Sequence, residues 1–362
     1  MCREVIWFTT ISLLLFLEGS EKMDGKIADR SEEITDEEWL TVNEFNREMV
    51  EDYLSNQTHL SPQSIPAYRS ALRIFFVWVK NNLHDKKCIE IKKKEFLRYL
   101  NWLANRGLSE AGIKFKKSSV SAMNKFIENF YEDEYPLFRN FVTSEMQVPK
   151  TGKVFAKEPL TPDEMEHLYK ILEEREEWMK LAYVKFTYST GCRRAESRQL
   201  LKEVINYEPR RKVVKIIDEN GIEQEMESIS YKTHDIRCKG RSRAGKIRKL
   251  QFGSDVMDAL KKWIEVRGDD DCPYMFVVKH KDGTAHQVGE GVFNDWCQNE
   301  FSEIVGRRTT PHNFRRSRAT NLVCYDHRPL ETAQKLLGHE SSETTQIYVV
   351  REDLEDADDA FV

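Results

Sequence analysis

Residues 311–348 read PHNFRRSRATNLVCYDHRPLETAQKLLGHESSETTQIY, and this stretch decides the fold of the C-terminal region. His312 and Arg315 are three positions apart, so one helical turn is expected to place both side chains on the same face. Gly338 follows a run with helical apolar spacing, which is typical of a helix end. The stretch predicts three helices: 311–325, 329–337 and a short one at 342–349.

His339 and Tyr348 complete a group of side chains that suits one kind of chemistry. A protein hydroxyl that opens a phosphodiester needs a proton acceptor, and it needs cationic donors for the nonbridging oxygens. Tyrosine supplies the hydroxyl, histidine accepts protons near neutral pH, and arginine offers planar donors. Pro311 places His312 in the first helical turn, where free backbone N–H groups favour an anion. These residues predict DNA strand transfer by a tyrosine rather than by a metal-activated water.

Charge is distributed unevenly along the chain, although the net charge is only −5. Residues 232–249 hold eight lysines and arginines against one acid, and residues 307–318 hold five arginines and no acid. Residues 351–362 hold six acids and a single arginine. Local basic segments are what contact with phosphates requires, whatever the total charge.

Length and composition indicate a soluble protein of two or three domains. The chain has 362 residues, of which 40% are hydrophobic and 32% charged, enough apolar sequence for a buried core. Its seven cysteines are scattered and include no C-x-x-C pair. This pattern favours a reducing compartment over a disulfide framework or a zinc site, so we expect a cytoplasmic protein.

The N-terminus is the segment that suggests another location. Residues 5–17 are mostly apolar and resemble the core of a signal peptide. The run is too short to span a bilayer as a helix, and no convincing small-x-small cleavage site follows it. We expect translation to begin at Met23, residues 1–35 to be a loose or mis-assigned extension, and no stable membrane association.

Residues 36–145 predict a small domain of four helices. Thr35-Asp36-Glu37-Glu38 is a capping box, and helical apolar spacing follows it as far as Tyr53. Ser61-Pro62 predicts the start of the second helix. The four helices are expected to begin at residues 35, 61, 90 and 109. Basic side chains gather on the last two and are candidates for contact with the DNA backbone: Lys92, Lys94, Lys114, Lys116 and Lys117.

Residues 146–159 lack periodicity and predict a linker. A second domain is expected over 160–350, beginning at the capping box Thr161-Pro162-Asp163-Glu164. Within it, Asn220-Gly221 predicts the turn of a β-hairpin. The predicted strands are 212–217 with 222–226 and 229–238 with 247–252; the predicted helices include 178–188, 192–200, 254–266 and 291–305. The expected fold class is α+β, mainly α with a small antiparallel β-sheet.

Thr190-Gly191-Cys192-Arg193-Arg194-Ala195-Glu196 resembles the first arginine box of the tyrosine recombinases, the phage integrase family. His312-x-x-Arg315 resembles the second box, Leu337-Gly338-His339 the third, and Thr345-Gln346-Ile347-Tyr348 the segment of the nucleophile. Lys239-Gly240 resembles the lysine that the family carries on a β-hairpin. The four N-terminal helices resemble its SAM-like core-binding domain, so residues 160–350 would form the catalytic domain.

The resemblance implies a role for each matching residue. The roles are nucleophile for Tyr348, phosphate binding for Arg193 and Arg315, general base for His312, phosphate orientation for His339 and general acid for Lys239. Glu196, one turn from Arg193, would support it as an ion pair. Arg241, Arg243 and Arg316 are further candidates for DNA contact. Arg316 is a departure, because the family often has histidine there, and the segment before Lys239 is longer than in compact relatives.

The family also implies a covalent 3′-phosphotyrosine with a free 5′ hydroxyl, which another strand's 5′ hydroxyl resolves. The bond energy stays in the phosphotyrosine, so no metal, ATP or other cofactor is expected. The implied partner is double-stranded DNA with a recombination site, bound by a homo-tetramer, and the implied source is a bacterium, a phage or a mobile element. The tail 351–362 is either a disordered end or a segment that docks on a neighbouring protomer.

Three other functions compete with this interpretation. A type IB topoisomerase uses the same tyrosine chemistry to nick and reseal one strand, but that group more often has lysine at the position of His312. A DNA-binding regulator on an inactivated recombinase fold would have no use for Tyr348. A metal nuclease is disfavoured because the histidines lack an accompanying cluster of carboxylate ligands.

Overall fold

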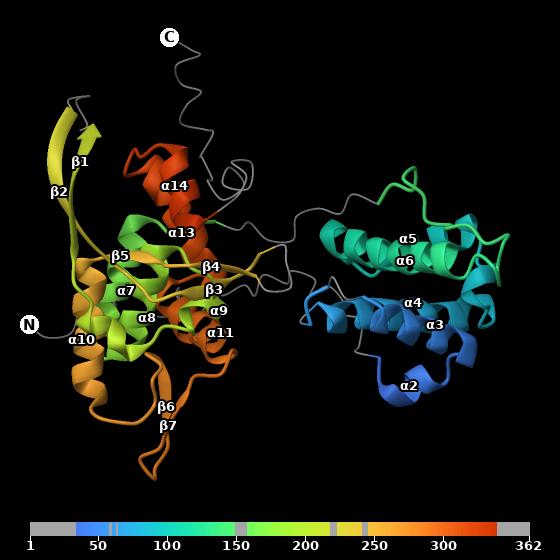
Figure 1. The fold of residues 1–362 in the computed structure, drawn as a ribbon, viewed down its shortest axis with the longest axis horizontal. Coiled ribbons are helices and arrows are strands. Elements are labelled where there is room, and N and C mark those ends of the chain that lie inside the picture. The colour runs from blue at the N-terminus through green and yellow to red at the C-terminus, as the bar shows by residue number, and fades with distance from the viewer. Residues whose placement is uncertain are drawn as a thin grey trace, which may run out of the picture. The chain divides into compact units, whose positions relative to one another are not determined.

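The computed structural model describes residues 34–57, 60–62, 64–148, 158–217, 223–240 and 245–338. The chain divides into two compact units, Met1–Ala156 and Lys157–Val362 (Figure 1), and each has a hydrophobic core of its own. The division falls within the segment expected to be a linker. Met146 and Val148, at the start of that segment, pack against the core of the first unit.

The first unit is a group of helices around aromatic side chains. Its elements are α2 (Asp36–Leu40), α3 (Glu44–Ser55), α4 (Ile65–Leu83), the 3₁₀ turn η1 (Cys88–Glu90), α5 (Lys93–Asn105) and α6 (Glu110–Phe130). Phe75 of α4 and Phe96 and Tyr99 of α5 are fully buried, with ring centroids 4.9 to 5.8 Å apart. Aromatic pairs at such distances stabilise a core beyond simple burial, so they hold α4 and α5 together.

The single helix predicted for residues 35–53 is two helices in the structure. Asn43 separates them: its side chain accepts the Asn46 N–H as the N-cap of α3, and its amide donates to Asp85 Oδ1 at 2.9 Å. Asparagine side chains that bond to nearby backbone compete with a continuing helix. The prediction of one helix is therefore wrong.

Helix α4 also begins later than predicted. The Ser64 N–H donates to the Ser61 carbonyl at 2.8 Å, and the helix begins at Ile65 with Pro66 in its first turn. Proline suits the first turn of a helix wherever it occurs, so both Pro62 and Pro66 fitted the pattern. Helices α5 and α6 lie close to their predicted positions.

The second unit is built around α8 (Trp178–Thr190), which packs against α7 (Pro162–Glu174), α10 (Ser254–Arg267) and α13 (Pro311–Cys324). Tyr183 of α8 is fully buried and stacks on Phe293, with ring centroids 4.1 Å apart. The predicted capping box at Thr161 is present. The remaining helices of this unit that the structure describes are α9 (Arg194–Ser197), η2 (Lys202–Asn206), α11 (Val292–Trp296), the π-helical η3 (Cys297–Phe301), α12 (Ser302–Val305) and α14 (Leu330–Leu337).

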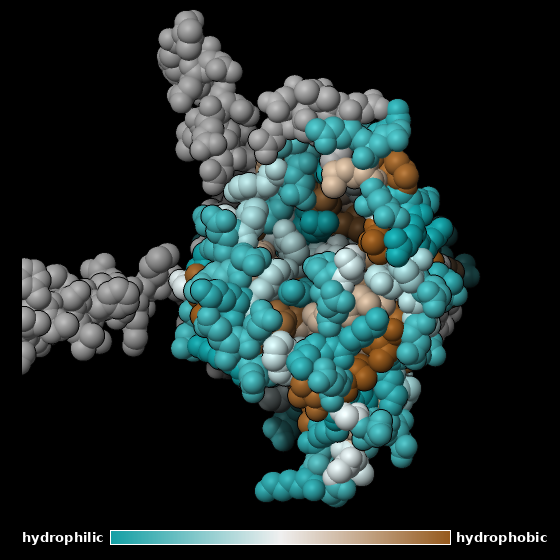
Figure 2. Space-filling view, turned by 90° about the vertical axis from the view of Figure 1, so that its left-hand side faces the viewer, coloured by the Kyte–Doolittle hydropathy of each residue, from teal (hydrophilic) through white to brown (hydrophobic). Residues whose placement is uncertain are grey.

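Small antiparallel sheets accompany these helices, which confirms the expected fold class. Strands β1 (Arg210–Ile217), β2 (Glu223–Lys232) and β5 (Gln251–Gly253) form one sheet in the order β1-β2-β5. Strands β3 (Ile236–Cys238) and β4 (Lys246–Arg248) form a second, and β6 (Val277–Lys279) and β7 (Ala285–Gln287) a third. The β1–β2 register pairs Val214 with Met226, both exposed. The face that lies on the left in Figure 1 is mainly hydrophilic, with separate apolar patches (Figure 2).

The predicted pairing of 229–238 with 247–252 is confirmed, but it is interrupted: residues 230–232 pair with 251–253 and residues 236–238 with 246–248. Residues up to Lys232 complete β2, and the chain leaves that sheet at Thr233, whose buried hydroxyl accepts the Leu250 N–H at 2.9 Å. Each predicted strand is therefore divided between two sheets. The β6–β7 hairpin was not predicted, because strands of three residues are too short for a clear alternation of apolar and polar side chains.

Several predicted features lie outside the described residues: the Asn220-Gly221 turn, Arg241, Arg243, His339, Tyr348, the helix at 342–349, the tail 351–362 and most of residues 1–35. Among the helices that the structure describes, none is long and apolar enough to cross a membrane.

Candidate active site

The turn after α8 places Arg193 at the start of α9. Gly191 ends α8 in the left-handed region, at φ +57°, and Arg193 is the N-cap residue of α9. A Cβ on Gly191 would lie 2.3 Å from Leu337 Cδ2, so this turn packs directly against the end of α14. Glycine is required here both for its backbone angle and for its size.

Glu196 fixes Arg193 through two contacts. Its Oε2 accepts the Arg193 N–H at 3.0 Å, and its Oε1 accepts from Arg193 Nη1 at 2.9 Å. This confirms the ion pair predicted from their spacing. Glu196 is buried, and burial disfavours the charged carboxylate. The Arg193 N–H, the Arg193 guanidinium and the nearby Arg248 outweigh that cost and lower the pKa of Glu196, so the residue is ionised at neutral pH.

Arg315 of α13 is fully buried. Its Nη1 donates to the Gly191 carbonyl, and its Nη2 donates to the Leu337 carbonyl at 3.0 Å. The guanidinium thus joins the turn before Arg193 to the end of α14, two positions before His339. Arginine has five N–H donors, and these bonds use two of them. In this structure Arg315 supports the backbone around the site.

His312 and Arg193 line the same pocket, which has a volume of about 480 Å³. His312 lies in the first turn of α13 after Pro311, as predicted, and its side chain is exposed. His312 and Arg315 were expected on one face of the helix, but only His312 lines this pocket. The remaining lining residues are Cys192, Arg194, Ala195, Asn294, Gln298, Thr310 and Pro311. Guanidinium, imidazole and amide groups around one space suit an anionic substrate.

Lys239 directly follows β3, and its side chain is exposed. It therefore lies on a hairpin connection, as predicted, although the strands of this hairpin have only three residues each. The two glycines of the connection approach closely: a Cβ on Gly240 would lie 2.9 Å from the carbonyl carbon of Gly245. The base of the loop is narrow, which limits where Lys239 can lie.

Arg248 of β4 is a site residue that sequence reasoning missed. Its Nη1 donates to the Leu336 carbonyl at 2.9 Å, and its Nη2 lies 3.7 Å from Glu196 Oε2. Its Nε contacts Cys238 Sγ at 3.3 Å. Arg248 is one of eight basic residues between 232 and 249, so no local signal distinguished it from the others.

Gln199, just after α9, is a second residue that was missed. Its Nε2 donates to the Arg237 carbonyl at 2.9 Å, and its Oε1 accepts the Arg237 N–H at 3.0 Å. One side chain thereby satisfies both backbone groups of a residue in β3. The sequence contains no sign of this contact, because it joins positions 38 residues apart.

The lysines expected to contact DNA differ in their surroundings. Lys92 and Lys94 are exposed at the start of α5. Lys114 pairs with an acid one turn earlier, burial lowers the pKa of Lys116, and Lys117 donates to a backbone carbonyl. Lys92 and Lys94 are therefore better placed for a phosphate than the three lysines of α6. Arg316, on α13, is half-buried.

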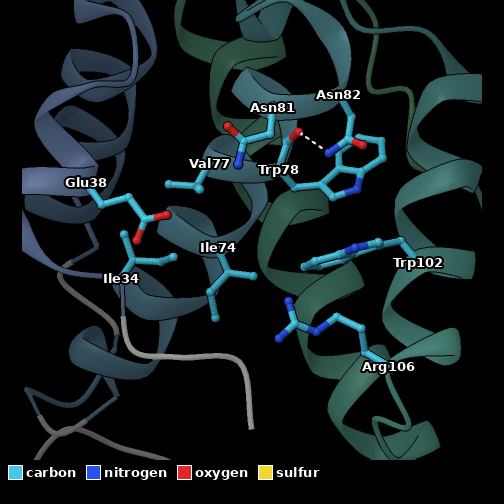
Figure 3. A pocket seen from close by; sticks show the side chains of 9 residues that line it. All are labelled: Ile34, Glu38, Ile74, Val77, Trp78, Asn81, Asn82, Trp102 and Arg106. Carbon is cyan, nitrogen blue, oxygen red and sulfur yellow. Dashed lines mark hydrogen bonds between the residues drawn. The ribbon is translucent and has the colours of Figure 1, made fainter. Parts of the chain in front are cut away.

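A further pocket, of about 220 Å³, lies in the first unit and includes none of the predicted site residues. Trp102 lies between Trp78 and Arg106 there (Figure 3), and the Arg106 guanidinium is 4.9 Å from the centroid of the Trp102 ring. Cation–π contacts of this kind are common structural features. Within the described ranges, no group of three or more His, Cys, Asp or Glu side chains is placed to hold a metal ion.

Known proteins match both units of the chain. Residues 158–355 match the Phage integrase family, and residues 50–129 match the Phage integrase, N-terminal SAM-like domain. The SPbeta prophage-derived recombinase-like protein YomM of Bacillus subtilis (strain 168) is 31% identical over 336 residues, which cover 91% of this chain and 95% of YomM. Tyrosine recombinase XerC of Vibrio vulnificus (strain YJ016) is 24% identical over 258 residues, 69% of this chain and 70% of XerC.

Solved structures of DNA recombinases share the fold. The Tn1549 transposon integrase in complex with circular intermediate DNA superposes with a TM-score of 0.59 at 17% identity, covering 88% of this chain and 99% of that one. A lambda integrase dimer bound to a COC′ core site gives a TM-score of 0.55 at 16% identity, covering 83% and 76%. The two family matches and the 31% identity to YomM show that the chain belongs to the phage integrase family, and it is a tyrosine site-specific recombinase that acts on DNA.

Proposed function

We propose that this recombinase cleaves one DNA strand by attack of the Tyr348 hydroxyl on phosphorus. The bond from tyrosine oxygen to phosphorus forms as the bond from phosphorus to the 5′ oxygen breaks, which leaves a 3′-phosphotyrosine and a free 5′ hydroxyl. The number of phosphoester bonds is unchanged, so the step needs no ATP, and cationic side chains take the charge-stabilising role that a metal would otherwise fill. Attack by the 5′ hydroxyl of another strand reverses the chemistry and joins the new pair of strands.

The pocket that Arg193 and His312 share is the observation that carries this proposal. A phosphate there would accept from Arg193, whose guanidinium is oriented by the buried Glu196. His312 is the base that takes the phenol proton of Tyr348. Arg315 supports the same site from the turn at Gly191 to the end of α14.

The other two roles rest on the resemblance and on position in the chain. His339 follows the end of α14, which Arg315 and Arg248 bind through the Leu337 and Leu336 carbonyls, and it orients the phosphate. Lys239 is the general acid that protonates the departing 5′ oxygen. Its exposed side chain on a hairpin connection is consistent with a group that reaches bound DNA.

Trapping on a suicide substrate tests the proposal. A nicked duplex that carries the recombination site loses the short 5′-hydroxyl strand after cleavage, so the covalent protein–DNA complex accumulates. We expect a complex from the wild type in the presence of EDTA and none from Tyr348→Phe. Tyr325→Phe is the matched control, because Tyr325 is an exposed tyrosine of the same unit, and it should react like the wild type.

Each outcome separates this mechanism from an alternative. A duplex that the wild type binds but does not cleave would favour an inactivated DNA-binding regulator. A complex that forms but reseals only its own strand, without transfer to a second duplex, would favour an enzyme like a type IB topoisomerase. Loss of the complex on addition of EDTA would overturn the metal-free step.

We further propose that four protomers assemble on two recombining duplexes, and that the chain is encoded by a phage or another mobile element. Exchange between two duplexes requires four strand cleavages, which four copies of one active site can supply. The prophage origin of YomM and the DNA-bound dimer of lambda integrase support these proposals. Crosslinking of the protein on two-site DNA should give a tetramer; a dimer as the largest species in complexes that recombine would contradict it.

DNA contact is proposed for five basic residues outside the catalytic set: Lys92, Lys94, Arg241, Arg243 and Arg316. A phosphate contact releases counterions. Its loss therefore makes the slope of log binding constant against log salt concentration shallower by about one unit. We expect Lys92→Ala and Lys94→Ala each to reduce the slope in this way. Lys114→Ala, whose lysine already pairs with an acid, should change it less.

A further inference from the structure

The β3–β4 hairpin that carries Lys239 cannot determine its own position. Its strands have three residues each and, among the strands that the structure describes, form a two-stranded sheet. Two bonds of 2.9 Å between Thr233 and Leu250 join only its base to the β2–β5 pair. Two strands by themselves are marginally stable at best. A general acid needs to lie within hydrogen-bonding reach of the atom it protonates, so the hairpin must be held by other elements.

Gln199 holds the first strand of the hairpin to α9, which β3 contacts. Its side-chain amide makes reciprocal bonds of 2.9 and 3.0 Å with the backbone carbonyl and N–H of Arg237. The same Nε2 donates to the Ala195 carbonyl at 2.7 Å. Gln199 therefore joins α9, the helix that Arg193 caps, to a residue two positions before Lys239.

Arg248 holds the second strand to two other parts of the site. Its planar guanidinium binds the Leu336 carbonyl and lies beside the Glu196 carboxylate, while its Nε contacts Cys238 across the hairpin. The side chain is only 15% exposed. Arginine can span several partners with a rigid fork of donors, which lysine cannot. Arg248 thus connects the hairpin both to Glu196 of α9 and to the end of α14.

We propose that Gln199 and Arg248 are positioning residues that place Lys239 at the scissile phosphate. The inference rests on the proposed role of Lys239 as general acid. Neither residue needs to touch DNA, because each acts through the backbone of the hairpin. A displacement of the reacting group by about 1 Å can slow a reaction by about 100-fold, so a loosened hairpin would slow cleavage while the fold and DNA binding persist.

A double-mutant cycle tests the proposal against a role in stability alone. Gln199→Ala and Arg248→Lys are each made in the wild type and in Lys239→Ala. Single-turnover rates of covalent complex formation are measured at saturating suicide DNA, together with DNA affinity and the melting temperature. Ile247→Ala is the matched control, because its side chain is an exposed neighbour on β4. Gln199→Ala carries the test alone if Arg248→Lys fails to fold.

We expect each variant to slow cleavage by about 10-fold to 100-fold in the wild type, with DNA affinity unchanged, and to add no further loss in Lys239→Ala. Residues that act as one unit are non-additive in this way. Wild-type rates in both variants, or full multiplicative losses in Lys239→Ala, would overturn the proposal. Absence of any complex from the wild type would instead overturn the proposed function, and a Lys239→Ala rate equal to that of the wild type would remove the role on which this inference rests.

Discussion

The guanidinium of Arg248 packs against the α-carbon of Gly338, where α14 ends. A Cβ on Gly338 would lie 2.5 Å from Arg248 Nη1 and 3.0 Å from its Cζ, and the residue has φ +66°. Both the crowding and the left-handed backbone oppose any larger residue. We expect Gly338→Ala to displace Arg248 or the turn before His339, to cost about 2 to 3 kcal/mol of stability, and to slow cleavage. Denaturant unfolding and suicide-substrate trapping measure the two effects.

Gly306→Ala separates the crowding from the backbone effect. Gly306 also ends a helix in the left-handed region, at φ +76°, but no described atom lies within 4 Å of the position its Cβ would take. This variant should cost only about 1 to 2 kcal/mol and leave the cleavage rate unchanged. Equal stability losses in the two variants, with cleavage intact in both, would show that the contact between Gly338 and Arg248 contributes neither to stability nor to cleavage.

Arg193→Ala should slow covalent complex formation by about 100-fold to 1,000-fold, the usual effect of removing one fixed donor from a developing charge. Arg193 is held in place by a buried carboxylate, so its contribution is expected in the transition state more than in DNA binding. Single-turnover rates at saturating DNA measure the first, and a binding titration the second.

Arg175→Ala is the matched control for this arginine. It removes the same charge from the same unit at an exposed position, where Arg175 lies 3.9 Å from Glu300. We expect a rate within about twofold of the wild type, because exposed ion pairs contribute little. A similar slowing in both variants would mean that net charge, and not the position of Arg193, explains the effect.

Lys239→Ala should be rescued by a substrate that needs no general acid. In a duplex with sulfur in place of the scissile 5′ bridging oxygen, the leaving group departs as a thiolate and requires no proton. We expect the variant to be slow on normal DNA and to approach the wild-type rate on the sulfur-containing duplex. Rescue of Lys246→Ala instead of Lys239→Ala would assign the general acid to the next lysine along the described hairpin.

Predictions from local chemistry were the most successful part of the sequence analysis. The capping box at Thr161 involves atoms three residues apart, and Thr161 Oγ1 accepts the Glu164 N–H at 3.2 Å as expected. The Arg193–Glu196 pair follows from the same spacing. Pro311 and Gly191 mark a helix start and a helix end through backbone angles that these residue types favour.

Features that depend on distant partners were missed. Arg248 acquires its role from a carbonyl 88 positions later, and Asn43 divides the first predicted helix with the help of a contact 42 positions away. Periodicity is a local signal and contains no information about such pairs. The burial of Arg315, one turn from an exposed histidine, depends in the same way on the Gly191 and Leu337 carbonyls. The placement of His339 and Tyr348 stays a prediction.

Glu196→Gln should make the free energy of unfolding depend less on pH in the acidic range. The pKa of Glu196 is lowered in the folded chain because its bonds to Arg193 and its contact with Arg248 outweigh burial. A carboxyl with a lowered pKa stabilises the fold above its unfolded pKa, about 4.3 for glutamate. That contribution is lost as pH falls through the folded pKa.

The neutral amide keeps the shape of Glu196 but loses the charge, so at pH 7 we expect Glu196→Gln to be less stable by about 2 kcal/mol. The difference from the wild type should stay constant down to about pH 5, shrink below about pH 4 because the carboxyl of the unfolded chain is protonated there, and disappear once pH falls through the lowered folded pKa. Urea unfolding at several pH values measures it. Glu173→Gln, at an exposed position on α7, controls for the change in net charge and should show little difference at any pH. A difference for Glu196→Gln that does not diminish in acid would mean that the amide disturbs packing rather than the ion pairs with Arg193 and Arg248.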